Sequence, residues 1–223
     1  MSAQSLPVEL LHHIFSLVCI PCHRHRRPPA EAVAPALGLG RICRNWRTVV
    51  WGMPELWEQL DIVEFKRDHG GGLGNEIDLI REWIQRVQGR LSTISVSPSC
   101  RSYWQHSPLP IFKLLTSHST TWKSLYLHIT CDCTLFLKAF ARGRVPCLET
   151  LYIKRDSVGK IERYGPALDF IADAPSLTVI DYEGHCLPAA SITQPWPRLV
   201  SLTEQSGFGD IGDLQKSVPT SNT

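Results

Sequence analysis

Hydrophobic residues near the start of the chain recur at the spacing of an α-helix. One apolar stripe is followed, one residue later, by a second: Leu6, Leu10, Ile14 and Leu17, then Leu11, Phe15 and Val18. Two adjacent stripes predict a helix that packs against neighbours on two sides. Pro7 suits the first turn of this helix, where its missing N–H is no loss.

The following residues predict a loop and two more short helices. Prolines at positions 21, 28 and 29 predict a solvated loop over residues 21–34. One helix is predicted from residue 35 to 38 or 40, and another from 41 to 50, where the buried residues would be Ile42, Trp46, Val49 and Val50. Residues 53–57 close this helical unit, and residues 60–65 read as a short strand or an extended exit.

A second pattern begins at Asn75, after a glycine-rich stretch. Residues 76–88 predict an amphipathic helix that Gly89 ends. The pattern Leu-x-x-Leu-x-Leu, with some substitutions, then recurs with first positions at 91, 122, 148 and 177, and more weakly at 199, in steps of 31, 26, 29 and 22 residues. Helices are predicted between these strands at 111–119, 134–142 and 167–174. Such alternation is typical of a leucine-rich repeat solenoid, whose units share one core. An unrelated α/β sheet is the alternative, because any half-buried strand alternates in this way.

The N-terminal residues resemble a known family. Leu-Pro-x-Glu-Leu-Leu-x-x-Ile-Phe at 6–15, Ile-Cys-Arg-x-Trp-Arg at 42–47 and Pro-Glu-Leu-Trp at 54–57 resemble an F-box of the kind found in large fungal, basidiomycete-like families of F-box proteins with a leucine-rich region. The resemblance implies docking on the Skp adaptor of SCF ubiquitin ligases. It assigns the docking and core roles to Leu6, Pro7, Leu10, Leu11, Ile14, Phe15, Ile42 and Trp46. One departure is the stretch 21–40, which is longer and richer in proline than a compact F-box needs.

These patterns together predict an α+β or α/β repeat fold. Residues 1–60 would be an F-box-like helical module with a loop insertion at 21–34, and residues 61–75 a linker. Residues 76–205 would form a short, degenerate leucine-rich-repeat-like region, and 206–223 a flexible tail. Trp51 and Trp57 are predicted to cover the contact between the helical module and the repeats.

Composition adds limits on function. The 223 residues are 43% hydrophobic and 20% charged, with a net charge of +2, so no global charge drives binding to nucleic acid or membrane. The eight cysteines are irregularly spaced in a long chain, which favours reduced thiols over a disulfide scaffold. No export signal is evident, and we expect an intracellular protein, cytoplasmic or nuclear.

Several local motifs could carry chemistry. Cys19-Ile20-Pro21-Cys22-His23 matches the pattern of c-type haem attachment, and Cys19, Cys22, His23 and His25 could bind zinc. A chance match at a helix end is the favoured interpretation, so we expect no metal and no cofactor. Residues 68–75 lack the third glycine of a dinucleotide-binding turn, and the basic run at 23–27 reads as a solvated loop rather than a phosphate contact or nuclear-import signal. No catalytic motif appears, and we expect no catalytic residues.

The sequence therefore favours a non-catalytic adaptor that docks on the Skp adaptor through residues 6–60 and holds a protein substrate through the repeats. A stand-alone repeat scaffold for protein–protein binding, without a role in ubiquitin transfer, is the alternative. A metal- or haem-binding protein built on the Cys19–His25 cluster is the third hypothesis. The identity of the substrate does not follow from the sequence.

Overall fold

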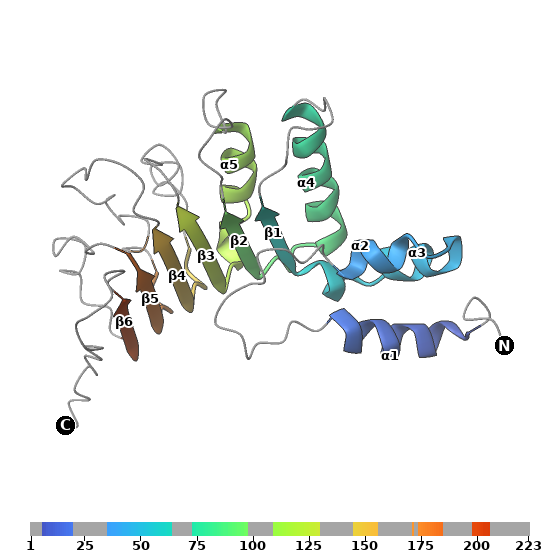
Figure 1. The fold of residues 1–223 in the computed structure, drawn as a ribbon, viewed down its shortest axis with the longest axis horizontal. Coiled ribbons are helices and arrows are strands. Elements are labelled where there is room, and N and C mark those ends of the chain that lie inside the picture. Colours follow the sequence, from blue (N-terminus) through green and yellow to red (C-terminus); the bar gives the residue numbers. More distant parts are fainter. Residues whose placement is uncertain are drawn as a thin grey trace.

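The computed structural model describes residues 6–19, 35–63, 73–97, 109–129, 145–155, 171, 174–184 and 198–205. These residues form a mixed helix and strand fold around a parallel sheet of six strands in the order β1-β2-β3-β4-β5-β6 (Figure 1). The strand order follows the chain order, so each strand pairs with the strands before and after it in sequence. The predicted α/β class is confirmed at this level.

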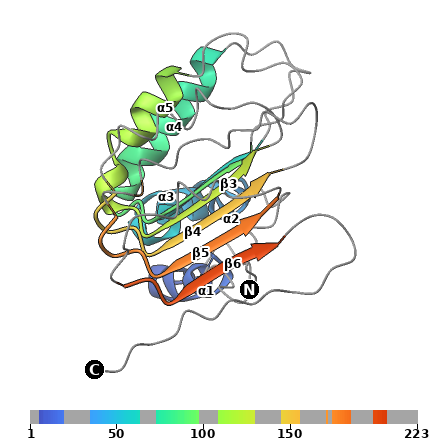
Figure 2. The ribbon, with the colours of Figure 1, turned by 90° about the vertical axis from the view of Figure 1, so that its left-hand side faces the viewer.

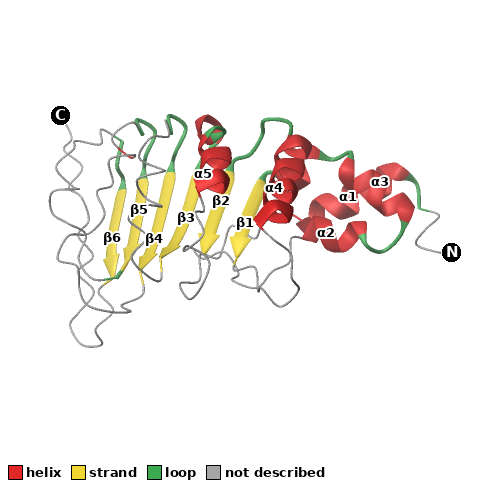
Figure 3. Cartoon of the chain, turned by 90° about the horizontal axis from the view of Figure 1, so that it is seen from above, coloured by secondary structure: helices red, strands yellow, loops and turns green. Residues whose placement is uncertain are grey.

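Three short helices precede the sheet and lie beyond the edge formed by β1 (Figures 1 and 3). They are α1 (Val8–Cys19), α2 (Pro35–Gly40) and α3 (Arg44–Trp51), followed by the 3-10 helix η2 (Pro54–Trp57). Two further helices, α4 (Leu73–Val87) and α5 (Leu109–Thr116), lie along one face of the sheet (Figure 2), and the short 3-10 helix η5 (Ser119–Thr121) follows α5. The helices predicted over these stretches are confirmed. The helix predicted at 134–142, the loop at 21–34 and the tail at 206–223 lie outside the described residues, as does the helix predicted at 167–174 apart from residues 171 and 174.

The strands from β2 to β6 fall where the apolar repeat predicts them, and β1 falls within the stretch 60–65 predicted as a short strand or extended exit, beginning one residue earlier. They are β1 (Gln59–Val63), β2 (Thr93–Ser97), β3 (Ser124–Ile129), β4 (Thr150–Arg155), β5 (Val179–Glu183) and β6 (Ser201–Gln205). The sheet register aligns the central apolar residue of each copy into one row: Leu60, Ile94, Leu125, Leu151, Ile180 and Leu202. The first five members of this row are at most 5% exposed. One face of the sheet is therefore the core face.

Each strand from β2 onward begins with the same pair of backbone hydrogen bonds. The carbonyl of Glu58 accepts the N–H groups of Ser92 and Thr93 at 2.9 and 3.1 Å, and the carbonyl of Ser92 accepts those of Lys123 and Ser124 at 2.7 and 3.0 Å. The same two bonds recur at the starts of β4, β5 and β6. The strands therefore keep one register, although the segments that connect them differ in length.

Two sequence-based boundaries need correction. Residues 61–63 of the predicted linker belong to β1, because they pair with Ser95–Ser97 of β2. Residues 73–75 belong to α4, so both ends of the predicted linker at 61–75 have to be shortened. Residues 64–72 lie outside the described residues.

Candidate docking surface

The helix α1 buries one of its two apolar stripes and exposes the other. Leu11 and Phe15 are fully buried. The ring of Phe15 meets the ring of Trp46 edge-on, with 5.0 Å between centroids. The other stripe lies largely in solvent: Leu10 is 51% exposed, Ile14 37% and Leu17 61%. Val18, at the end of the Leu11 stripe, is also 54% exposed. Since Leu10, Ile14 and Leu17 share one side of the helix, α1 presents a row of uncovered aliphatic side chains.

The helix α3 begins later than the sequence predicts. Cys43 is its N-cap, and the Cys43 Sγ accepts the N–H of Trp46 at 3.4 Å. Ile42 therefore precedes the helix and is 57% exposed, so the prediction that Ile42 is buried is wrong. Trp46 is half-buried against the core, while Val49 and Val50 are buried as predicted.

Exposed large apolar side chains concentrate in these helices. We define the docking surface as the exposed aliphatic residues of α1, α2 and the turn that follows α2: Val8, Leu10, Ile14, Leu17, Val18, Leu37 and Ile42. Beyond this surface and Trp51, the large hydrophobic side chains that are exposed in the described part of the chain are Leu79 and Val200. An apolar concentration of this kind is typical of a surface that meets another protein.

The structure divides the eight predicted docking residues into two groups. Leu10, Ile14 and Ile42 are exposed on the docking surface, and Pro7 is exposed at the start of α1. Leu11 and Phe15 lie in the core, and Leu6 and Trp46 are partly buried against it. The buried and partly buried side chains of the second group can therefore hold the docking surface in place, but they cannot make its main contacts with a partner. The sequence missed Leu17, Val18 and Leu37 as exposed members of the same surface.

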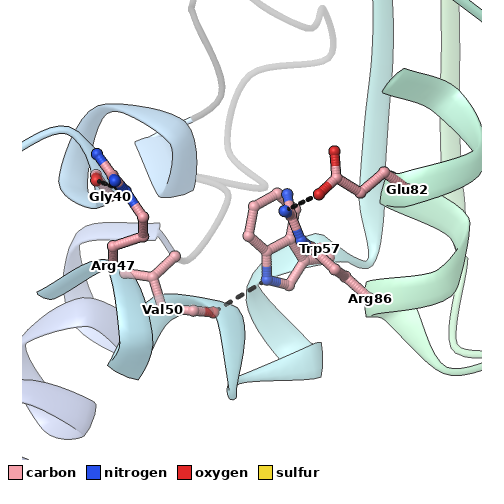
Figure 4. Close-up of polar contacts among 6 residues, drawn as sticks. All are labelled: Gly40, Arg47, Val50, Trp57, Glu82 and Arg86. Atoms are coloured by element: carbon pink, nitrogen blue, oxygen red, sulfur yellow. Dashed lines mark hydrogen bonds and ion pairs between the residues drawn. The ribbon is translucent and has the colours of Figure 1, made fainter. Parts of the chain in front are cut away.

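A cluster of aromatic rings joins these helices to α4. Trp57 is fully buried, and its Nε1–H donates to the Val50 carbonyl oxygen at 3.0 Å (Figure 4). The ring of Trp83 on α4 lies 4.7 Å from that of Trp57, and the Trp83 Nε1–H donates to the Trp57 carbonyl oxygen at 2.8 Å. Trp57 therefore lies at the contact between the N-terminal helices and α4.

Arg86 completes the junction from α4. Its guanidinium carbon lies 4.3 Å from the centre of the Trp51 ring and 4.8 Å from that of Trp57, and the side chain also pairs with Glu82 (Figure 4). A guanidinium at these distances is attracted to both ring faces. Arg47 holds the neighbouring helices together, since its Nε–H donates to the Gly40 carbonyl oxygen at 2.9 Å. These contacts fix the direction in which α1–α3 point relative to the sheet.

The sheet face opposite α4 and α5 carries a polar row that the sequence did not single out. Asp61, Ser95, Tyr126, Tyr152 and Asp181 are aligned on five adjacent strands. They occupy the positions next to the core-facing residues, and side chains of neighbouring strand residues point to opposite faces. Their alternation with apolar residues was visible in each strand, but their alignment depends on the register between strands.

Of the candidate metal cluster, the described residues include Cys19 alone. Cys19 ends α1 as a half-buried free cysteine, and burial raises the pKa of its thiol. Cys22, His23 and His25 lie outside the described residues. Within the described ranges, no group of three His, Cys, Asp or Glu side chains is placed to hold a metal ion.

Each helix in the described ranges of the chain is too short or too polar to cross a lipid bilayer. No family model, no curated protein and no solved structure matches this chain.

Proposed function

We propose that this chain is a non-catalytic adaptor subunit of an SCF-type ubiquitin ligase. Its α1–α3 unit would be an F-box-like module that docks on the Skp adaptor, and its sheet would be a short leucine-rich-repeat-like array that holds a protein substrate. Catalysis would then lie in other subunits, and the contribution of this chain is proximity, because tethering raises the effective concentration of the substrate.

The observation that carries the proposal is the docking surface. Leu10 and Leu17 would be costly to leave in water, and no described element of the chain covers them. Leu11 and Phe15, which a free-standing helical unit needs to bury for its own stability, are already buried within the fold. The chain thus has an apolar surface in excess of what its own fold uses, on the residues that carry the F-box resemblance.

The repeating backbone bonds at the strand starts support the second half of the proposal. A further copy of the apolar pattern is present at Trp57, Leu60 and Ile62, in the same register as the later copies. With this copy included, each strand from β1 to β6 corresponds to one copy of the apolar pattern. Stacked units of this kind present a continuous surface made of one or two residues from each unit.

The test measures association of the full chain with a purified Skp adaptor. The double variant Leu10→Asp/Leu17→Asp places two charges on the docking surface and should reduce affinity at least about a hundredfold, because a buried unpaired charge is strongly unfavourable at an interface. Both residues are more than half exposed, so the variant should keep the wild-type circular dichroism spectrum and melting temperature.

The matched control is Leu79→Asp, which adds a charge to an exposed leucine of α4 away from the docking surface. It should leave the affinity within about twofold of wild type. Wild-type chain that is folded but does not bind the Skp adaptor would refute the ligase role. That result would favour the stand-alone scaffold, for which the apolar surface has a different partner.

A further inference from the structure

The exposed side of α3 carries arginines without carboxylate partners. Arg44, Arg47 and Trp51 lie on one side of this helix, because residues three, four and seven positions apart share a helix face. We define these three residues as the basic face. Arg44 and Arg47 are exposed, and Trp51 is 46% exposed. In the part of the chain that the structure describes, neither arginine forms an ion pair.

The position of Arg44 is unfavourable for the isolated fold. Arg44 is the first residue of α3, where the helix dipole disfavours a cation, and the first turn holds no acidic residue. Arg47 lies one turn further along the same side, and like charges at this spacing repel each other. Residues 40–51 contain arginines at 41, 44 and 47 and no Asp or Glu. The basic face therefore gathers positive charge that α3 does not neutralise.

The side chain of Arg47 is held in place by contacts that leave its terminal nitrogens available. Its Nε–H donates to the Gly40 carbonyl oxygen at 2.9 Å (Figure 4). Its guanidinium carbon lies 5.7 Å from the centre of the Trp51 ring. A guanidinium has further N–H donors on its two terminal nitrogens. Arg47 is therefore oriented before a partner arrives, which lowers the entropic cost of binding.

Trp51 is also held, by a second arginine whose charge is already offset. The Arg86 guanidinium carbon lies 4.3 Å from the centre of the Trp51 ring, and Arg86 is paired with Glu82. The Arg86 side chain is only 16% exposed, so it is not offered to a partner. The charges available at this face are therefore those of Arg44 and Arg47, beside a partly exposed aromatic ring of fixed orientation.

We propose that the basic face binds an extended, acidic protein segment with glutamates at alternate positions. One carboxylate accepts hydrogen bonds from Arg44 and the next accepts them from Arg47, while the aliphatic part of a glutamate packs on the Trp51 ring. Alternate residues of an extended segment point to the same side about 6.7 Å apart, close to the separation of about 5–6 Å between Cβ atoms three positions apart on a helix. Each guanidinium can donate two parallel hydrogen bonds to a carboxylate.

A protein segment fits this face better than a nucleic acid does. Proteins that follow a single strand use a basic groove that extends over several nucleotides, whereas Arg44 and Arg47 cover about one turn of α3. The neighbouring helix α4 exposes Asp78 and Glu82 as well as arginine. A short acidic segment is therefore the favoured occupant. The inference goes beyond the proposed ligase role and does not depend on it.

The experiment titrates the full chain into a dye-labelled Gly/Ser peptide with glutamates at alternate positions and follows fluorescence polarisation at low salt. The same peptide with glutamine in place of each glutamate should bind about tenfold more weakly, because the charge-assisted hydrogen bonds are lost. Added salt should weaken binding of the glutamate peptide, since exposed charges are screened.

A charge reversal assigns the binding to the basic face. Arg44→Glu should weaken binding of the glutamate peptide at least about tenfold, because like charges then meet at the contact. The side chain of Arg44 is exposed, and an acidic residue is favourable in the first turn of a helix, so the variant should keep or raise the melting temperature. The matched control Lys113→Glu reverses an exposed charge on α5, away from α3 (Figure 1), and should bind within about twofold of wild type.

Three results with folded chains would overturn the inference: no binding of the glutamate peptide, equal binding of the glutamine peptide, or equal loss in the Arg44→Glu and Lys113→Glu chains. Circular dichroism and the melting temperature establish that each variant is folded. A single-stranded oligonucleotide of equal charge that displaces the labelled peptide at a lower concentration than unlabelled glutamate peptide would also overturn it, because the face would then prefer nucleic acid.

Discussion

At the scale of one residue, Asp61 is a side chain whose position in the fold disfavours its charged form. The side chain lies on β1, next to the core residues Leu60 and Ile62, and burial disfavours its charged form. Hydrogen bonds from Gln59 and Ser95 offset only part of this effect, because the pKa remains raised. The charged form of Asp61 is therefore less favourable in the folded chain than in the unfolded chain.

The substitution Asp61→Asn tests this cost through its pH dependence. A carboxyl whose pKa is raised in the folded state holds its proton after the unfolded chain has lost it, so stability falls as pH rises from near the ordinary value of 3.8 to the raised value. Asparagine does not titrate. The variant should therefore gain stability relative to wild type across this window and hold a constant advantage above it. Urea unfolding at several pH values measures the difference, and a flat or declining difference would contradict the assignment.

At the scale of the element, the apolar repeat predicted the strands because their physical cause is local. Each copy places two alternating residues on the core face, and a leading residue buried just before the strand: Leu91, Trp122, Leu148 and Leu177 are at most 1% exposed. The copy that begins at Trp57 was missed, because Pro54–Trp57 also closes the helical unit and the two roles overlap in one residue.

The surfaces were harder to predict than the elements that carry them. The sequence does not distinguish the two stripes of α1. In the fold, Leu11 and Phe15 are buried, with Phe15 against Trp46, whereas Leu10 and Leu17 are left in solvent. The polar row is a property of five strands at once. Its members are separated by connections of unequal length, so no local spacing in the sequence brings Asp61 and Tyr126 together.

The turn between α4 and β2 permits a prediction with a matched control. Gly89, which was predicted to end this helix, has φ of +77°, and the N–H of Arg90 donates to the Val87 carbonyl oxygen at 3.0 Å. Gly89→Ala should lower the free energy of unfolding by about 1 kcal/mol, because an L side chain is strained at positive φ.

Gly38 is the control, since it lies inside α2 without a positive φ and has open space where the methyl group of an alanine would lie. Gly38→Ala should raise the free energy of unfolding by about 0.5 kcal/mol or more, through the lower entropy of the unfolded chain. Urea unfolding of both variants measures the two changes. The same sign for both would show that backbone conformation at Gly89 is not what ends the helix.

At the scale of the whole molecule, one core connects the two proposed surfaces. Buried apolar contacts run from Leu11 and Phe15 in α1, through Trp57 and Trp83, to Leu177 before β5. Trp57 joins the helices to α4 through its hydrogen bonds with Val50 and Trp83, and Leu60 and Ile94 of the sheet belong to the same core. A substrate on the sheet would therefore be held at a fixed position relative to a partner on α1–α3.

This continuity makes a prediction that also tests the division into residues 1–60 and 76–205. Leu151→Ala removes a fully buried side chain from β4 and should cost about 2–5 kcal/mol. If the helices and the sheet unfold as one unit, amide hydrogen exchange at Val49 and Val50 of α3 should accelerate by the same factor as exchange in β4, about thirtyfold or more. Leu79→Ala, at an exposed position of α4, should change neither rate appreciably. Exchange in α3 that Leu151→Ala leaves unchanged would show instead that the helical unit is a separate folding domain, and the orientation of the two surfaces would then depend on the contacts of Trp51, Trp57 and Arg86 alone.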